Sequence, residues 1–306
     1  EDKTKQLYPR IAAVFTIKQG TKPEVHQNLL GLLAKDETLQ PFAMRALSDR
    51  EADAANGSFA ATNFPAAVKS PNPRTRLEAA VAFARVGPAS WAPTVADLLG
   101  DADPVIAHTA FRALAEKKAA DACFAVVDKA DAPYPQRQGA LYALMRMHEP
   151  AVVDGLIARL EKETDSARRR GLLAALCRLH FVDGPWKGDS WGTRPDTRGP
   201  YYQPEKWGQS DKVMAALKGA LGRAQGEEAG WLAGEMTRNR IEDDSAVKQL
   251  ITLAANDAKL RSSLISQLAK KDNVPQEAIP LLTAASVAPD TAAEERAAAI
   301  AILTKT

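Results

Sequence analysis

Cysteine and histidine are scarce in this chain, with only two cysteines and four histidines among 306 residues. Cys123 and Cys177 both lie in apolar helical stretches, which favours buried free thiols over a disulfide between them. The signatures H-E-x-x-H, G-x-G-x-x-G, the Walker-type loop and G-x-S-x-G are absent. We therefore expect no catalytic residues, no metal site and no cofactor, so the chain is predicted not to be an enzyme.

Two further absences concern charge and hydrophobic runs. The chain has 40 basic and 38 acidic residues, a net charge of +2, without the basic excess typical of nucleic-acid-binding proteins. No apolar run approaches the roughly 18 residues needed to cross a bilayer, so membrane insertion is not expected. The chain starts at Glu1 without a methionine, as expected if a leader has been removed. Its last helical stretch, 291–305, has no polar capping repeat after it, so we expect a fragment of a longer protein.

What the sequence does contain is a repeat. A small residue, or a leucine in three of the units, is followed four positions later by a larger apolar residue. Such a pair lies on one face of a helix and marks its buried side. Successive pairs are spaced by 30 to 36 residues, except for one spacing of 60. The pairs are Ala13/Ile17, Ala43/Leu47, Ala79/Phe83, Ala110/Leu114, Ala140/Leu144, Leu172/Leu176, Leu232/Met236, Leu264/Leu268 and Ala299/Leu303.

A second positional signal runs in phase with the first. Three positions before the first member of the pair, six of the nine units carry an arginine: Arg10, Arg76, Arg137, Arg169, Arg261 and Arg296. Four positions earlier still, four units carry a residue suited to capping a helix N-terminus: Asn72, Asp103, Asp165 and Asp257. Pro73 and Pro104 follow two of these at the first helical position, where proline is tolerated.

Each of these helices is followed by a short turn and a second amphipathic stretch, for example 23–35, 90–100, 149–162 and 244–256. One helix pair cannot bury its apolar face alone, so neighbouring pairs must stack. The stretches NPRTRLEAAVAFARVG (72–87) and DPVIAHTAFRALAEKK (103–118) resemble the first helix of HEAT repeats. The predicted fold is therefore all-α, an α–α superhelix or HEAT/ARM-like solenoid over residues 1–306, with about eight to nine helix pairs. Residues 51–63 depart from the pattern and predict a short second helix there.

One segment, 183–208, interrupts the repeat where the spacing is 60 residues. It holds three tryptophans, two tyrosines, five glycines and four prolines. This glycine and proline density forbids a regular helix, whereas the aromatic content is unlike that of a disordered linker. We expect an ordered Ω-like loop inside the sixth repeat, inserted after His180 and packed against the solenoid.

Three interpretations of this loop remain open. It covers the groove between two repeats, or it binds a carbohydrate, a small acidic molecule or the apolar anchors of a partner, or its aspartates hold Ca²⁺. The calcium interpretation lacks the twelve-residue pattern of an EF-hand. The candidate binding residues are Trp186, Trp191, Arg194, Asp196, Arg198, Tyr201, Tyr202 and Trp207.

Two smaller clusters each have a functional and a structural interpretation. Cys177, His180 and Asp183 have the spacing to supply metal ligands, but a fourth partner is missing and Cys177 is expected to face the core. The run 168–170, three arginines, suits an anionic partner, although acidic residues just upstream nearly balance its charge. For both clusters we favour the structural interpretation.

The string WGTRPDTRGPYY (191–202), within a HEAT-like array, resembles a segment of large multidomain proteins of planctomycete and verrucomicrobial bacteria. Those proteins typically join a sugar-dehydrogenase-like β-propeller, a HEAT-repeat region and a C-terminal c-type haem domain. The resemblance implies a redox-linked parent protein with an extracytoplasmic location, periplasmic or secreted. It supplies no catalytic residue here, because this chain has no C-x-x-C-H and no propeller pattern.

The sequence thus predicts a non-enzymatic scaffold, or protein-interaction module, whose partner is another protein or a neighbouring domain of the same polypeptide. The alternative is a ligand-binding module in which the 183–208 loop binds a carbohydrate or a small acidic molecule.

Overall fold

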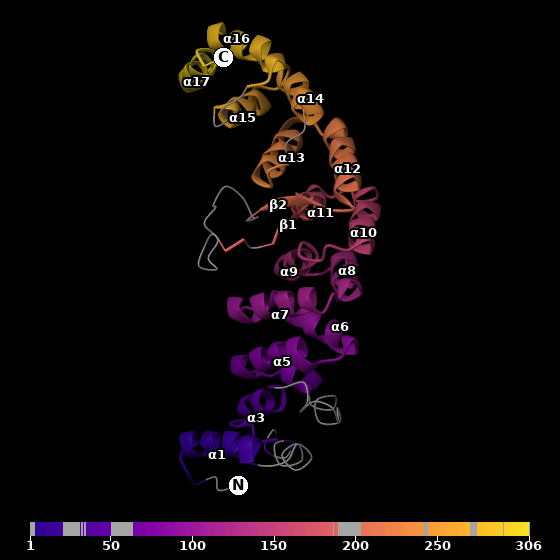
Figure 1. Ribbon diagram of the computed structural model, residues 1–306, viewed down its shortest axis with the longest axis vertical. Coiled ribbons are helices and arrows are strands. Elements are labelled where there is room, and N and C mark those ends of the chain that lie inside the picture. The colour runs from indigo at the N-terminus through magenta and orange to yellow at the C-terminus, as the bar shows by residue number, and fades with distance from the viewer. Residues whose placement is uncertain are drawn as a thin grey trace. The chain divides into compact units, whose positions relative to one another are not determined.

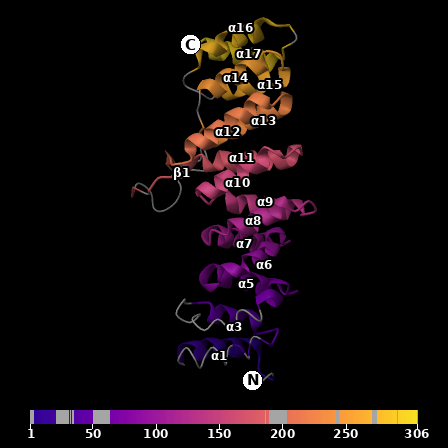
Figure 2. The ribbon, with the colours of Figure 1, turned by 90° about the vertical axis from the view of Figure 1, so that its right-hand side faces the viewer.

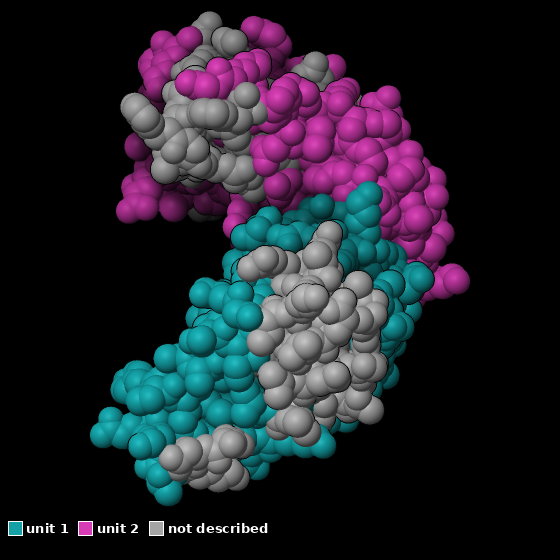
Figure 3. Space-filling view, turned by 60° about the horizontal axis from the view of Figure 1, so that its bottom comes forward, with its two compact units in different colours: residues 1–147 teal, residues 148–306 magenta. Residues whose placement is uncertain are grey.

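The computed structural model describes residues 4–20, 31, 33, 35–49, 64–185, 187, 188, 203–241, 244–269, 274–289 and 291–305. Over these residues the chain is an all-α solenoid with one short two-stranded ribbon, as the repeat predicts. It divides into two compact units, residues 1–147 and 148–306, which Figure 3 colours separately. None of the described helices is long and apolar enough to span a membrane.

In the first unit, the helices that carry the predicted buried pairs stack on one another in chain order, α1 on α3, α3 on α5, α5 on α7 and α7 on α9. The shorter second helices line the opposite side (Figure 1). The elements are α1 (Leu7–Gly20), α3 (Gln40–Leu47), α5 (Pro73–Val86), η2 (Ala89–Trp91), α6 (Ala92–Val95), η3 (Ala96–Gly100), α7 (Pro104–Glu116), α8 (Ala120–Asp128) and α9 (Tyr134–Leu144). Residues 64–68 are also helical.

The second unit repeats this arrangement, with α11 on α13, α13 on α15 and α15 on α17, while α12 packs on α14 (Figures 1 and 2). Its elements are α10 (Pro150–Leu160), α11 (Ser166–Leu179), β1 (Phe181–Asp183), β2 (Pro204–Lys206), α12 (Ser210–Arg223), α13 (Gly226–Arg238), α14 (Asp244–Ala254), α15 (Ala258–Leu268), η4 (Gln276–Ala278), α16 (Ile279–Val287) and α17 (Ala293–Leu303).

All four predicted N-cap side chains accept a hydrogen bond from a backbone N–H in the first turn of their helix. Asn72 accepts from Arg74 at 3.0 Å, Asp103 from Val105 at 2.9 Å, Asp165 from Arg168 at 2.8 Å and Asp257 from Leu260 at 3.0 Å. These N–H groups have no acceptor inside the helix, so the caps fix where each first helix begins.

From α3 to α17 every first member of the predicted pairs is buried, and so is every second member except Leu47 and Leu303, which are half-buried. In α1 the prediction is wrong, because Ala13 is exposed and Val14 is buried in its place. Val14 forms a small core with Leu39 and Ala46. Among the described helices α1 stacks mainly on α3, and Leu33 also packs against its core.

The structure gives the repeated arginines a role that the sequence did not. In the first unit, the Arg76 guanidinium donates to both carboxylate oxygens of Asp101, at 2.6 and 3.0 Å, and to the carbonyl oxygens of Ser70 and Pro71. Such a two-pronged bond is stronger than a single charged contact. The hydrogen bond from Arg76 lowers the pKa of Asp101 below its usual value. The Arg76–Asp101 pair links the α5 repeat to the segment that begins the next repeat.

Each of the other five repeated arginines makes one or both of these contacts, a bond to the turn before its helix or an ion pair with the next repeat. Arg137, Arg169 and Arg296 donate to carbonyl oxygens in the turn just before their own helix. Arg10, Arg169 and Arg261 pair with an acidic residue of the next repeat, namely Asp36, Glu228 and Glu295. The repeated arginines therefore connect a helix to the turn before it or to the next repeat, and Arg76 and Arg169 connect it to both.

The arginine run 168–170 is used in the same way, which supports its structural interpretation. Arg169 pairs with Glu228 at 3.2 Å, and Arg170 pairs with Glu227 at 3.0 Å and lies over the Trp231 ring at 5.5 Å. These contacts join α11 to α13. The prediction of buried free thiols is also confirmed, since Cys123 and Cys177 are both free and buried, and burial raises the pKa of Cys123 to about 12.

The second helices are less regular than predicted. The stretch 90–100 is not one helix but a succession of η2, α6 and η3, with Pro93 in the first turn of α6. A 3₁₀ segment is narrower than an α-helix, and short pieces of it are common beside a constrained turn. The predicted stretches 149–162 and 244–256 contain α10 and α14. Most of 23–35 and all of 51–63 lie outside the described residues.

Candidate functional site

The insertion of the sixth repeat leaves the solenoid as a two-stranded antiparallel ribbon. Strand β1 follows α11 directly and pairs with β2, Phe181 opposite Lys206 and Asp183 opposite Pro204. The ribbon continues at Gly184, whose N–H donates to the Gln203 carbonyl at 2.7 Å. No strand was predicted here, because three residues on each side are too few for an alternating pattern.

Buried polar groups hold the base of this ribbon between α11 and α12. His180 is 1% exposed, and its Nδ1 donates to the Ser210 carbonyl at 3.1 Å. The Ser210 hydroxyl returns the contact by donating to the His180 carbonyl at 2.6 Å, and it accepts from the Trp207 N–H at 2.8 Å. Each of these bonds satisfies a group that is withdrawn from water, so the network fixes both ends of the insertion.

A second histidine completes the base. His148 Nε2 lies 2.8 Å from the Phe181 carbonyl, which can only accept, so this nitrogen is the donor. The Trp207 ring meets the His148 ring edge-on, with centroids 5.3 Å apart, and its indole N–H donates to the Leu179 carbonyl at 2.7 Å. Through these two contacts the Trp207 side chain holds the base of the ribbon against the helices.

Replacing Ser210 by alanine is expected to lower the free energy of unfolding by about 1–3 kcal/mol, because the Trp207 N–H loses its acceptor and the His180 carbonyl its donor. Urea unfolding followed by circular dichroism measures this change, and faster hydrogen exchange at the Trp207 amide locates it. The control is Ser286→Ala, because that hydroxyl bonds only to Thr283 within α16. Equal effects of the two substitutions would show that the network contributes nothing.

Of the eight candidate binding residues, only Trp207 falls among the described residues. Trp186, Trp191, Arg194, Asp196, Arg198, Tyr201 and Tyr202 lie outside them, so a ligand site on this loop stays a prediction. The possible metal ligands behind the loop are engaged otherwise. Cys177 is buried, His180 bonds to Ser210, and Asp183 pairs with Arg178 at 3.9 Å. Over the described part of the chain, no group of three or more His, Cys, Asp or Glu side chains is placed to hold a metal ion.

A surface that sequence reasoning missed lies on α7 and α9 of the first unit. Phe111 contacts His108 edge-on at 4.7 Å between ring centroids and Tyr142 at 5.9 Å. The Arg146 guanidinium lies 5.6 Å from the centre of the Phe111 ring. We call these four residues the α7/α9 aromatic cluster. Its members are one or two positions from the nearer residue of the buried pair in their repeat, and the repeat analysis did not follow these positions.

The exposed residues around the cluster are also large and apolar. Val105 on α7 is 58% exposed, Tyr142 on α9 is 46% exposed, and Tyr134 at the start of α9 is 68% exposed. Tyr134 and Tyr142 lie about two turns apart on the same side of α9. The face therefore combines aromatic rings with a cation in a form that binding surfaces favour.

Taken with the stacked helix pairs and their arginine links, the structure defines a helical-repeat solenoid, a class whose repeats build extended binding surfaces. Residues 60–136, which lie in the first unit, match the family model described as HEAT repeats. Among solved structures, the chain is similar to the crystal structure of an engineered protein from the Northeast Structural Genomics Consortium. The two share 17% identity, with a TM-score of 0.36, over 98% of this chain and 85% of that one. No curated protein matches the chain.

Proposed function

We propose that this chain is a non-enzymatic helical-repeat scaffold that binds a protein partner through the α7/α9 face of its first unit. The observation that carries the proposal is the α7/α9 aromatic cluster, in which Tyr142 is exposed and Arg146 lies over Phe111. Tyrosine and arginine dominate the energetic centres of protein interfaces, since each combines a large contact area with hydrogen-bonding capacity.

The chemistry of the face also indicates what kind of partner it suits. Arg112 is paired with Glu116 on the same helix at 3.0 Å, so its charge is largely compensated. Arg146 is exposed and lies over the Phe111 ring, so a positive charge stands beside the aromatic surface. A partner segment with an apolar or aromatic anchor next to a carboxylate would satisfy both features. Such a contact buries the rings and places a carboxylate beside the arginine.

A photo-reactive phenylalanine at position 142 tests this proposal in cells that produce the native protein. We expect a discrete crosslinked product, because the side chain at 142 lies at the centre of the proposed interface. Gel electrophoresis and mass spectrometry identify the product. The same residue at position 97, an exposed site on η3 on the opposite side of the unit, is the matched control.

Substitution of Arg146 by glutamate provides the second arm of the experiment. It reverses the exposed charge without touching the core, so the fold should persist while the product at position 142 falls by about tenfold or more. Crosslinking that is equal from positions 142 and 97, or unchanged by Arg146→Glu, would reject this face as the interface.

Location and context form a finer part of the proposal and rest on the resemblance of residues 191–202 alone. We propose that the scaffold works outside the cytoplasm, within a redox-linked multidomain protein that supplies any catalysis from other domains. The neighbouring reading frame decides this: a propeller upstream and a C-x-x-C-H downstream support the proposal, and further repeats alone contradict it. Carbohydrate or small-acid binding by the 183–208 loop stays a second proposal for the same protein.

A further inference from the structure

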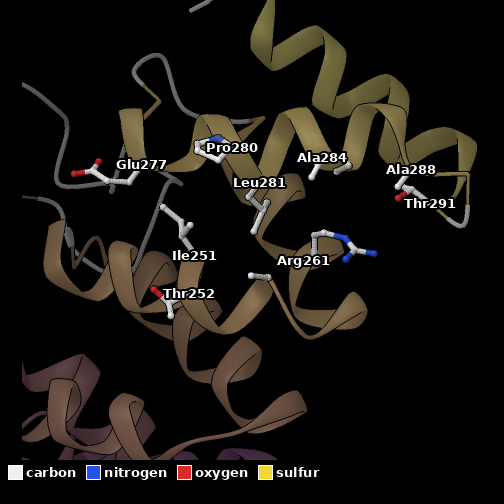
Figure 4. A pocket seen from close by; sticks show the side chains of 11 residues that line it. Ile251, Thr252, Arg261, Glu277, Pro280, Leu281, Ala284, Ala288 and Thr291 are labelled. Atoms are coloured by element: carbon white, nitrogen blue, oxygen red, sulfur yellow. The ribbon is translucent and has the colours of Figure 1, made fainter.

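A groove in the second unit lies between α14, α15 and α16 (Figure 4). Its volume is ≈ 340 Å³, within the lower range of small-molecule sites. The walls are mainly apolar, formed by Ile251, Ala255, Pro280, Leu281, Ala284, Ala285 and Ala288. Four polar residues, Thr252, Arg261, Glu277 and Thr291, line it as well.

Arg261 is the repeated arginine of its own repeat, and its contacts differ from those of four of the others. Arg76, Arg137, Arg169 and Arg296 each donate to carbonyl oxygens of the turn before their own helix. Among the described residues Arg261 makes no such bond, and only its Nε is engaged, with Glu295 at 3.2 Å. The two Nη groups therefore remain available on the side that lines the groove. Figure 4 shows the guanidinium pointing toward the end of the groove where Ala288 and Thr291 lie.

Thr291 provides a second and independent sign of a missing partner. The residue is 4% exposed and lines the groove, and its hydroxyl oxygen is buried without a hydrogen-bond partner. Buried hydroxyls in folded proteins are nearly always paired, because leaving one unpaired costs free energy. An unpaired hydroxyl beside a partly unpaired guanidinium indicates a site for an oxygen-rich group.

The charges at the two ends of the groove differ. At the Thr291 end, Arg261 is the charged residue among the described ones that line the groove, and its Nε is paired with Glu295. At the opposite end Glu277 is paired with Lys248 at 2.6 Å, and this bond lowers the pKa of Glu277. Leu281 lies between the two ends in Figure 4. The groove thus offers an apolar channel with guanidinium donors at one end.

We propose that this groove binds a small aliphatic carboxylate, with its carboxylate on Arg261 and Thr291 and its hydrocarbon chain along Leu281 and Ile251. The Nη groups and the hydroxyl then donate to the carboxylate oxygens, which satisfies the groups that the protein leaves unpaired. The chain covers apolar wall that is otherwise in contact with water. This site goes beyond a scaffold function, because stacking helices and docking a protein need no such groove.

Isothermal titration calorimetry of the whole chain with octanoate, octan-1-ol and octylamine tests the proposal. All three probes share the same hydrocarbon chain and differ only in the head group. We expect saturable one-to-one binding of octanoate, with octan-1-ol and octylamine at least about tenfold weaker, because neither forms charged hydrogen bonds with Arg261. Equal binding of octanoate and octan-1-ol, or no saturable binding of octanoate, would refute the site.

Two variants locate the site without relying on a residue needed for folding. Thr291→Val keeps the shape of the side chain and removes an unpaired hydroxyl. The melting temperature of the free protein should therefore stay equal or rise, while octanoate affinity falls by about tenfold. Arg261→Gln should lower affinity by at least as much.

The matched control is Arg169→Gln, which removes an equivalent arginine–glutamate pair in the same unit but far along the repeat from the groove. Its octanoate affinity should equal that of the wild type even if its melting temperature falls. Unchanged affinity in both Thr291→Val and Arg261→Gln, or an equal loss in Arg169→Gln, would overturn the assignment.

Discussion

Replacing Phe83 by alanine is expected to lower the free energy of unfolding of the first unit by about 3–5 kcal/mol. Phe83 is the second member of the buried pair in α5 and is fully buried, in a helix that packs on both α3 and α7. Removal of the ring leaves a cavity that three helices cannot close without shifting. Urea unfolding measures the loss, and amide hydrogen exchange should show it first in α5 and α7.

The control for this substitution is Val105→Ala on α7. That side chain is 58% exposed, so its loss should change stability by no more than about 0.5 kcal/mol. A similar effect of the two substitutions would mean that the stacked face between α5 and α7 is not the core of the unit. A broad loss of cooperativity in Phe83→Ala alone would support the nearest-neighbour stacking expected of a repeat protein.

Gly139→Ala should be the second most damaging change, although alanine is the better helix former. Gly139 is inside α9, where a β-carbon would lie 2.7 Å from the Leu99 carbonyl oxygen and 3.1 Å from the Leu99 β-carbon. Neither atom is at the end of a flexible side chain, so α9 and η3 must move apart. We expect the free energy of unfolding to fall by a net amount of about 1–3 kcal/mol, because the cost of overpacking exceeds the gain of about 1 kcal/mol from helix propensity. Urea unfolding of the variant measures the net change.

Gly219→Ala in α12 provides the comparison. A β-carbon at Gly219 meets only the Arg223 guanidinium, at 3.7 Å, which is an ordinary contact. The same chemical change should therefore stabilise the protein by about 0.5–1 kcal/mol. Opposite signs for the two glycines are the expected result, and two gains would show that α9 does not lie close against η3.

The buried face of the stacked helices and the first residue of several of them could be predicted from the sequence, because both depend on residues within or beside the same helix. The buried pairs and the caps Asn72, Asp103 and Asp165 are set by spacing within one helix, and the structure confirms them. The exception is Ala13, which is exposed, whereas Val14 is buried in its place. Burial there depends on what lies next to the helix, which no periodicity within the helix reveals.

The contacts between repeats could not be predicted in the same way. Arg76 was found by its spacing, but its partner Asp101 belongs to the segment that begins the next repeat. The α7/α9 aromatic cluster joins Phe111 to Tyr142 across two helices, and Arg261 of α15 lines the same groove as Thr291, which lies between α16 and α17. Each of these pairings depends on how one helix pair sits on the next, which the repeat length alone does not specify.

Most of the candidate site on the insertion also remains beyond the described residues, although the structure explains how its ends are held. Trp207, chosen from the sequence as a candidate binding residue, is engaged in the base of the ribbon through Leu179 and His148. An aromatic residue in a glycine- and proline-rich loop can serve binding or anchoring equally well by composition. The sequence could therefore not distinguish these roles, because the difference lies in the partner of the indole N–H.

The ribbon at the base of the insertion has a consequence for how this protein can vary. Asp183 and Pro204 face one another across the ribbon, so the loop leaves and re-enters the stack at neighbouring points whatever its length. Once the ends of a loop are fixed together, doubling its length costs only about 0.6 kcal/mol in closure entropy. The buried network of His180 and Ser210 lies on the solenoid side of this closure. Segments of different length and sequence can therefore be inserted at this position while the stacked helices stay the same.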